Sequence, residues 1–379
     1  MAATPPSPPD RPAENATEPA PDKAADATPP RATASPSPAD GAALPLGYAG
    51  IIAVLLVVAS IGAGLAIGTI ARPGPTPTPA PTIAAPTRTP VPTTDPQVFR
   101  QQLSSGCATG QGIWVVSDGG ALLRYDGEHW TQVDSTLRTL THASCDEQTL
   151  YAVGPVGAVL ILDDRARSIS SFDVTLAHLR GISAMPQGAM ASGTEGTVML
   201  LSGGTWHQYA SGIEEDLNAI VAFDLNSAWA VGSQGASYRL EPAGWRPVAT
   251  GVTVTLRAVS SSGPQSALAA GDAGTLLVFD GTWTAIESGV TSNLRSIARF
   301  GTAEWIAGDA GTLLKLDAVG GDHTAPRTAP PTEVDLGTTC DLRGVFVSGQ
   351  DLWVIGSTGS RAGVWRIRGD RVAERWGEC

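Results

Sequence analysis

The feature that most constrains this chain is a sequence repeat of about 38 residues that occupies its C-terminal part. The stretch that begins LRAV at Leu256 aligns closely with the one that begins LRSI at Leu294. Sliding this template along the chain gives seven unit starts, at Leu103, Leu140, Leu179, Leu217, Leu256, Leu294 and Leu342. Because a unit of this length matches one four-stranded blade, the repeat predicts an all-β, seven-bladed β-propeller.

Each unit has the marks of short strands joined by tight turns. An apolar stretch opens the unit, and a second stretch holds one bulky residue at a fixed place, which we expect to form a wedge between neighbouring blades. These residues are Trp114, Tyr151, Met190, Trp229, Leu268, Trp305 and Trp353. Two glycines three apart follow, such as Gly271 and Gly274. Glycine supplies the positive φ that hairpin turns require.

The repeat, written LRxV…WAVGxxGxLLxxDGxxW, resembles that of bacterial propellers related to the photosystem II assembly and stability factor family. It resembles BNR or sialidase-type propellers more loosely. The resemblance covers about residues 103–379. It implies a non-catalytic scaffold or binding protein outside the cytoplasm, and a photosynthetic role does not follow from it. The segments before the repeat depart from the usual layout of that family.

Three segments precede the propeller, which we expect at 98–379. Residues 1–45 are rich in Pro, Ala and Thr and lack apolar periodicity, which predicts a disordered tail. Residues 46–71 contain neither a charge nor a proline. A helix of this length exceeds the hydrocarbon core of about 30 Å, which predicts a single transmembrane helix. Residues 72–97 alternate Pro with Thr and Ala, which predicts a semi-rigid stalk.

Small residues follow one face of the predicted transmembrane helix. Ser60, Gly64 and Gly68 lie four apart, a spacing that lets two helices approach closely and form a dimer. The alternative is that small residues are simply common in membrane helices.

The four cysteines form no CxxC motif and no Cys/His pair at metal-ligand spacing, so no zinc site is expected. Cys107 and Cys145 lie at similar places in units one and two, which are neighbours. Cys340 precedes unit seven, and Cys379 lies where a following unit would begin, beside unit one in a closed ring. We therefore expect structural disulfides 107–145 and 340–379, the second of which would close the ring. Four cysteines allow three connectivities, so other pairings stay open.

Arginine fills the second position of four units, and we treat this set as a candidate ligand-binding rim of the channel. Its members are Arg180, Arg257, Arg295 and Arg343, whereas the other units have Ser104, Thr141 and Asn218. A ring of guanidinium groups at one mouth of the channel would bind a carboxylate or phosphate. In the alternative, each arginine pairs with an acid of a neighbouring blade, such as Asp272 or Asp309, and serves ring closure.

Composition and motifs exclude several classes of function. The formal net charge is −12 and no basic run is present, which argues against a nucleic-acid partner. The histidines have no partner at ligand spacing, and no loop offers enough oxygen ligands for calcium, so we expect no metal and no cofactor. A sialidase-like glycan hydrolase is the enzymatic alternative. Its aspartate-box motif is reduced here to forms such as Asp280–Trp283 and its tyrosines read as packing residues, so we expect no enzyme.

These observations predict a single-pass protein of the cell membrane whose propeller is a binding or assembly scaffold for a protein, peptide or glycan. The cysteines and the stalk favour a propeller outside the cell and a cytoplasmic N-terminal tail. The charge bias around the apolar segment is too weak to settle the orientation, so the inverted arrangement stays open. A further alternative is a sensor that signals through the cytoplasmic tail.

Overall fold

The computed structural model describes residues 99–134, 138–317 and 330–379. All of these residues belong to one compact unit, which lies within Ile83–Cys379. The predicted tail, the transmembrane helix, the stalk and the dimer seam at Ser60, Gly64 and Gly68 lie outside the described residues. Among the residues that are described, no helix has the length and apolar character needed to cross a membrane.

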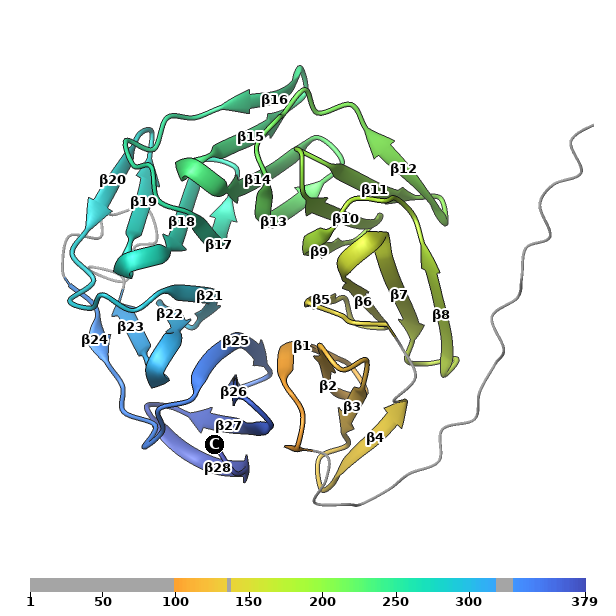
Figure 1. The fold of residues 1–379 in the computed structure, drawn as a ribbon, viewed down its shortest axis with the longest axis vertical. Helices are drawn as coiled ribbons and strands as arrows, with labels where there is room; N and C mark the ends of the chain where they lie inside the picture. The colour runs from red at the N-terminus through yellow and green to blue at the C-terminus, as the bar shows by residue number, and fades with distance from the viewer. Residues whose placement is uncertain (1–98, 135–137, 318–329) are drawn as a thin grey trace, which may run out of the picture. The chain divides into compact units, whose positions relative to one another are not determined.

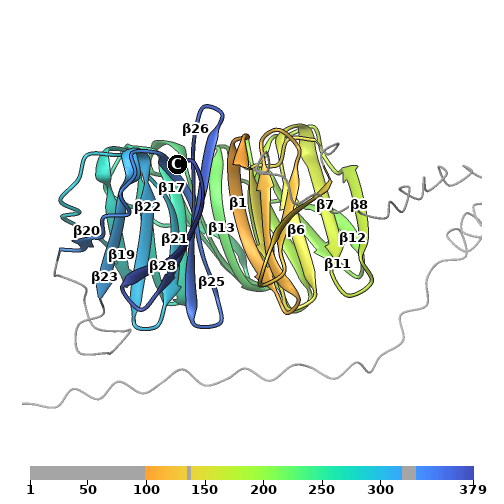
Figure 2. The same ribbon diagram turned by 90° about the horizontal axis from the view of Figure 1, so that it is seen from below.

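The described residues form seven antiparallel sheets of four strands, arranged as blades in a ring (Figure 1). Each blade uses four strands that are consecutive in the chain, which confirms the prediction of a seven-bladed propeller. Seen from the side, the strands run between the two faces of the ring (Figure 2). The predicted unit starts lie in the innermost strand of each blade or within two residues of it.

The strands of the first four blades are as follows. Blade 1 has β1 (Leu103–Thr109), β2 (Gly112–Ser117), β3 (Leu122–Tyr125) and β4 (Trp130–Asp134). Blade 2 has β5 (His142–Cys145), β6 (Thr149–Val153), β7 (Ala158–Asp163) and β8 (Ser168–Asp173). Blade 3 has β9 (Leu179–Met185), β10 (Gly188–Gly193), β11 (Val198–Ser202) and β12 (Thr205–Tyr209). Blade 4 has β13 (Leu217–Asp224), β14 (Ser227–Gly232), β15 (Ser237–Glu241) and β16 (Gly244–Pro247).

The remaining three blades follow the same plan. Blade 5 has β17 (Leu256–Gly263), β18 (Ser266–Gly271), β19 (Leu276–Asp280) and β20 (Trp283–Ile286). Blade 6 has β21 (Leu294–Phe300), β22 (Ala303–Gly308), β23 (Leu313–Asp317) and β24 (Thr332–Glu333). Blade 7 has β25 (Asp341–Ser348), β26 (Asp351–Thr358), β27 (Arg361–Arg368) and β28 (Arg371–Gly377). Short 3-10 turns η2 (Pro155–Gly157), η3 (Ser233–Gly235), η4 (Asp272–Gly274) and η5 (Asp309–Gly311) join second to third strands.

The core of the ring lies between the blades rather than within them. Each of its seven clusters of buried side chains combines residues of two neighbouring blades. Every cluster contains one of the seven predicted bulky residues, so the wedge prediction is confirmed. Trp229 of β14, for example, is fully buried against Leu256, Phe279 and Trp283 of blade 5.

Hydroxyl groups also connect the innermost strands, which belong to separate sheets and form no ladder with one another. The Ser105 hydroxyl accepts the Ala143 N–H at 3.2 Å, which joins blades 1 and 2. The same contact joins blades 2 and 3, 3 and 4, and 6 and 7, through Ser144, Ser183 and Ser296. A serine at this place satisfies a backbone donor that the twist between blades leaves unpaired.

The glycines of the turns between second and third strands have two separate roles. Gly274 has a φ of +69°, as predicted, and the residue before it, Ala273, also lies in the left-handed region. Gly271 is extended, with a φ of −160°. A Cβ atom there would approach the Thr255 carbonyl oxygen to 2.3 Å. The prediction is therefore wrong for the first glycine, which is required by a close backbone approach.

The ring closes between blades 7 and 1 through apolar packing. Tyr125 and Trp130 of blade 1 pack against Trp353 and Trp376 of blade 7, with ring centroids 5.1 to 6.3 Å apart. The Ser357 hydroxyl donates to the Leu103 carbonyl oxygen at 3.1 Å across this junction.

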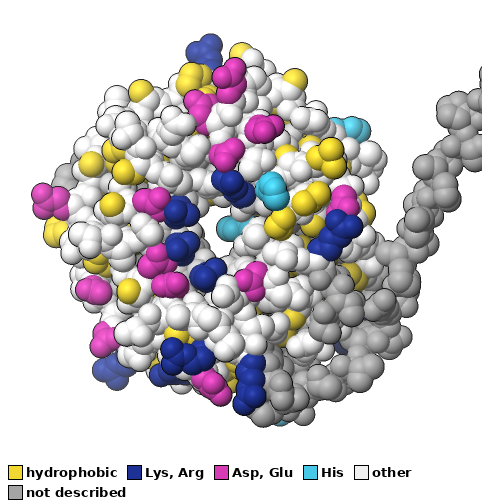
Figure 3. Space-filling model, viewed as in Figure 1, with side chains coloured by type: hydrophobic (Ala, Val, Ile, Leu, Met, Phe, Trp, Pro, Cys, Tyr) yellow, Lys and Arg dark blue, Asp and Glu magenta, His cyan; other side chains and the backbone are white. Residues whose placement is uncertain are grey.

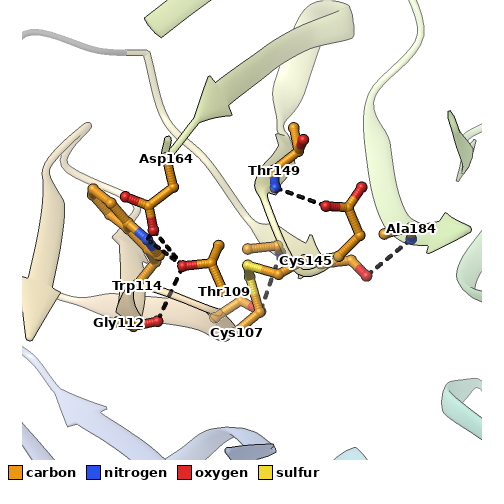
Figure 4. Close-up of a disulfide and its surroundings, with 12 residues drawn as sticks. Cys107, Thr109, Gly112, Trp114, Cys145, Thr149, Asp164 and Ala184 are labelled. Carbon is orange, nitrogen blue, oxygen red and sulfur yellow. Dashed lines mark hydrogen bonds between the residues drawn. A yellow bond between two sulfur atoms is a disulfide. The ribbon is translucent and has the colours of Figure 1, made fainter. Parts of the chain in front are cut away.

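Both expected disulfides are present, but only one of them joins two blades. Cys107 of β1 is bonded to Cys145 of β5, which links the innermost strands of blades 1 and 2 (Figure 4). Cys340 is bonded to Cys379, so this bridge connects the entry of blade 7 to its own end. The prediction that it closes the ring is wrong. Four antiparallel strands return the chain to the face at which the blade began, and Cys379 there packs in the cluster shared by blades 6 and 7.

Candidate binding surface at the channel mouth

One face of the ring carries all four predicted arginines, because the innermost strands begin there. Antiparallel pairing returns the turn after the second strand to the same face, as the pairing of Leu256 with Gly271 shows. We call this side the arginine face. Figure 3 shows it with basic and acidic side chains gathered around the central opening and apolar side chains on one side of it.

Two of the arginines are paired with an acid of their own blade. Arg257 donates from Nε and Nη2 to the two carboxylate oxygens of Asp272, and the Nη2 contact is 3.0 Å. Arg295 binds Asp309 in the same bidentate way, with an Nη2 contact of 2.9 Å. Burial acts to raise the pKa of Asp309, but the hydrogen bond and charge of Arg295 outweigh it and hold that pKa below its usual value. These guanidinium groups are occupied by the turns beside them.

Arg180 pairs with an acid of a neighbouring blade, as in the alternative in which the arginines serve ring closure. Its Nη1 lies 3.1 Å from Asp216 Oδ2 and donates to Asn218 Oδ1 at 2.9 Å, both at the start of blade 4. Asn218 in turn donates to the Leu256 carbonyl oxygen of blade 5 at 2.9 Å. The arginine thus begins a polar chain that crosses three blades.

Arg343 lies where blade 7 meets blade 1. In the part of the chain that the structure describes, its Nε is buried without a hydrogen-bond partner. Burial raises the pKa of nearby Asp118, and the charge of Arg343 opposes that rise. A ligand-binding role for the four arginines stays a prediction. Since three of them are held by carboxylates, the face does not present four free guanidinium groups.

Blade 2 departs from the charged pattern of this face. Thr141 stands where four blades have arginine, and Pro155 stands where blades 5 and 6 have the paired aspartate. Val156 follows at the tip of the turn with 44% of its surface exposed, and Leu176 in the next loop is 88% exposed. The Gly157 N–H donates to the Ala177 carbonyl oxygen at 2.7 Å, which brings the turn and this loop together. We call Pro155, Val156 and Leu176 the apolar patch.

The backbone of Val156 is in a conformation that its side chain disfavours. Its φ is +54°, and a β-branched residue is a genuine outlier in this region. The same place in the other 3-10 turns holds Gln234, Ala273 and Ala310, which are not branched at Cβ. The sequence reading treated this turn as one more hairpin, so the apolar patch was missed. The only sequence signal for the apolar patch was a valine, Val156, between the turn glycines Gly154 and Gly157.

The innermost strands line a polar cavity of about 240 Å³ in the central channel. Ser105, His142 and Cys145 are among the residues that line it. Burial lowers the pKa of His142 to about 4, so the imidazole is neutral at physiological pH. Nothing in the repeat pattern indicates that this histidine lines the channel. That His142 lines the channel follows only from its place as the first residue of β5, the innermost strand of blade 2.

We expect His142 to make the folded protein sensitive to acid. The unfolded chain protonates this histidine near pH 6.5, whereas the folded protein resists protonation until about pH 4. Stability should therefore fall as pH decreases through this window, by roughly 3 kcal/mol in total. Urea unfolding at pH 7, 5.5 and 4.5 should show a smaller loss for His142→Gln. The exposed His207→Gln serves as the matched control, and equal losses in both variants would contradict the assignment.

A Tyr–Glu pair that the sequence reading missed lies on the outer part of blade 4. The Tyr238 hydroxyl donates to Glu215 Oε2 at 2.6 Å. Burial and then Glu215 raise the pKa of Tyr238 to about 12. A phenol with that pKa stays protonated at neutral pH and is a poor nucleophile. Arg239, the next residue in the chain, is paired with Glu241, and Arg180 is bound to Asp216 and Asn218. The Tyr238–Glu215 pair is therefore best explained as a link between a loop and β15.

Two further hollows lie away from the channel mouth. A groove of about 550 Å³ on the opposite face is lined by Leu225, Arg239 and Pro264 among others. A pocket of about 300 Å³ lies between the outer strands of blades 1 and 2. Within residues 99–134, 138–317 and 330–379, no three His, Cys, Asp or Glu side chains gather as a metal site.

The solved structures whose fold resembles that of this chain include propellers. YCF48 from Cyanidioschyzon merolae matches with a TM-score of 0.56 and 15% identity, over 73% of this chain and 98% of that one. The WD40 β-propeller domain of Doa1 matches with a TM-score of 0.60 and 12% identity, over 72% and 94%. U3-55K matches with a TM-score of 0.60 and 10% identity, over 73% and 94%. At these identities the likeness establishes the fold alone. No protein-family model matches the sequence, and no curated protein matches it.

Proposed function

We propose that this protein is a membrane-anchored, non-catalytic binding scaffold that holds its propeller outside the cytoplasm. It captures a protein or peptide partner on the arginine face. The observation that carries the proposal is the apolar patch, where exposed Val156 and Leu176 lie beside a ring of paired charges.

The apolar patch stabilises neither the blade nor the ring. Leu176 leaves 88% of its surface in water, so it gains almost nothing from burial. Val156 occupies a strained backbone region, which costs on the order of 1–3 kcal/mol for such residues. Polar or glycine residues at both places would suit an isolated propeller better. Exposed apolar side chains that are gathered together mark surfaces for protein partners.

The location outside the cytoplasm is supported by two independent features. The described propeller contains two disulfides and no free cysteine, and disulfides persist in oxidising compartments. The apolar run at 46–71 and the Pro/Thr-rich run at 72–97 supply an anchor and a spacer on the N-terminal side.

Replacing Val156 with Asn and Leu176 with Ser should abolish partner capture without harming the fold. Asparagine tolerates the left-handed region, so stability should stay equal or rise by up to about 1 kcal/mol. Loss of two central apolar contacts should weaken partner binding by about tenfold or more. The measurement is a pulldown with the tagged full-length chain from extracts of its own cells, followed by titration of the captured partner.

The matched control is Val372→Asn, which removes an exposed apolar residue of similar size from blade 7. It should capture the partner as the wild type does. Equal capture by the patch variant and the wild type would show that the apolar patch is not the binding surface.

A further inference from the structure

The pocket between blades 1 and 2 is separate from the arginine face and is lined by charged residues of its own. Blade 1 contributes Trp114 and Arg124, and blade 2 contributes Asp164, Arg167 and Ile169. Its volume of about 300 Å³ is at the lower end of the range for small-molecule sites.

Asp164 is the key residue of this pocket. Only 5% of its surface is exposed. Its Oδ2 accepts a hydrogen bond from Trp114 Nε1 at 2.9 Å and another from the Thr109 hydroxyl (Figure 4). Among the described residues, Oδ1 accepts no hydrogen bond and no cation forms an ion pair with this carboxylate. Oδ1 is thus available to a cationic group of a ligand, which would pair with this carboxylate.

The need of the Trp114 indole N–H for an acceptor does not explain why that acceptor is a charged carboxylate. In blade 4 the equivalent indole, Trp229 Nε1, donates to a neutral backbone carbonyl, that of Pro264, at 3.2 Å. In blades 6 and 7 the indole nitrogens of Trp305 and Trp353 have no partner within the described ranges. The position of Asp164 after the third strand is held in other blades by Gly127, Gly203, Pro242, Gly281 and Gly369. Blade 2 therefore has a carboxylate where the fold needs none.

The same pocket also offers positive charge. The Arg124 guanidinium lies 5.6 Å from the Trp114 ring centroid and donates from Nη2 to the Gln111 carbonyl oxygen at 2.8 Å. Its Nε is buried without a partner in the described part of the chain. Arg167 is exposed at the turn that follows Asp164. The remaining charged residue, Asp126, is occupied by the N–H groups of its own turn, and these bonds lower its pKa.

We propose that this pocket binds a small zwitterion of the α-amino-acid type. The ligand ammonium pairs with Asp164 Oδ1, and the ligand carboxylate pairs with Arg124 and Arg167. An aliphatic side chain of the ligand packs on Val133 and Ile169, which line the wall. Both signs of charge and an apolar wall are present together, whereas a simple cation or a simple anion would satisfy one half of the site.

The test is calorimetric titration of the full-length chain with L-leucine, 3-methylbutylamine and 4-methylpentanoate. The last two lack the carboxylate and the ammonium group respectively. Leucine should bind, and each analogue should bind about tenfold more weakly or worse, because each loses one charged contact. Asp164→Asn should weaken leucine binding by a similar factor. The adjacent Asp163→Asn removes the same charge outside the pocket and should leave binding unchanged.

Arg167→Met provides a second variant at an exposed position, so the test stands even if Asp164→Asn unfolds. This variant should weaken leucine and 4-methylpentanoate while it leaves 3-methylbutylamine unaffected. Absence of leucine binding to the wild type would overturn the proposal. So would equal binding of leucine and the amine, or wild-type affinity in the Arg167 variant. The apolar patch plays no part here, so this result is independent of partner capture.

Discussion

Replacing Arg299 with Ala is expected to lower the free energy of unfolding by about 3–5 kcal/mol, the cost of removing one partner from a buried ion pair. Arg299 of β21 donates from Nε to Glu304 Oε1 at 2.7 Å. Glu304 of β22 is fully buried, and its Oε2 also accepts a hydrogen bond from the Ser260 hydroxyl of blade 5 at 3.0 Å. Without the guanidinium, its charge would remain in an interior that solvates it poorly.

Urea unfolding of the full-length chain measures this loss, and Arg246→Ala is the matched control. Arg246 approaches Glu241 at 3.4 Å, but its side chain is 67% exposed. A surface pair of this kind contributes at most about 1 kcal/mol. Adding Glu304→Leu to Arg299→Met should recover much of the stability, because the buried charge is then gone. A loss no larger than that of the control would show that water reaches Glu304.

Removing the Cys107–Cys145 bridge should lower stability by about 4 kcal/mol, the value that loop-closure entropy predicts for a loop of this length. The bridge joins residues 38 apart in sequence and connects the innermost strands of two blades. Its loss should therefore be felt throughout the ring, and a double alanine variant should unfold at a lower urea concentration.

The Cys340–Cys379 bridge closes a loop of nearly equal length, with a separation of 39, so the entropic term is similar. Because it holds the end of the chain, we expect local opening before global unfolding. Hydrogen exchange should show faster exchange in β28 of the Cys340→Ala/Cys379→Ala variant, with β1 and β5 still protected. Equal exchange patterns in the two double variants would contradict this difference between the bridges.

Several features of the protein are determined by the sequence alone because they recur with the repeat. Wedge residues such as Trp229 and Trp305 occupy one place in every unit, and a ring in which each blade contacts only its neighbours converts that place into an interface. The pairing of Cys107 with Cys145 follows by the same argument, since equivalent places in adjacent units lie side by side. Seven unit starts therefore sufficed for the blade count, the core and one disulfide.

Other features were decided only by the tertiary structure, because they depend on which separate chain segments the fold brings into contact. Arg257 and Asp272 belong to the same unit, and only the antiparallel return of β18 brings them into contact. Cys379 was misplaced by one blade because the sequence cannot show on which side of β28 the chain ends. Asp164 reads as an ordinary turn residue, yet Trp114 and Thr109 of the preceding blade bury it. Contacts between units that differ in sequence leave no periodic signal, and the pocket around Asp164 is built from such contacts.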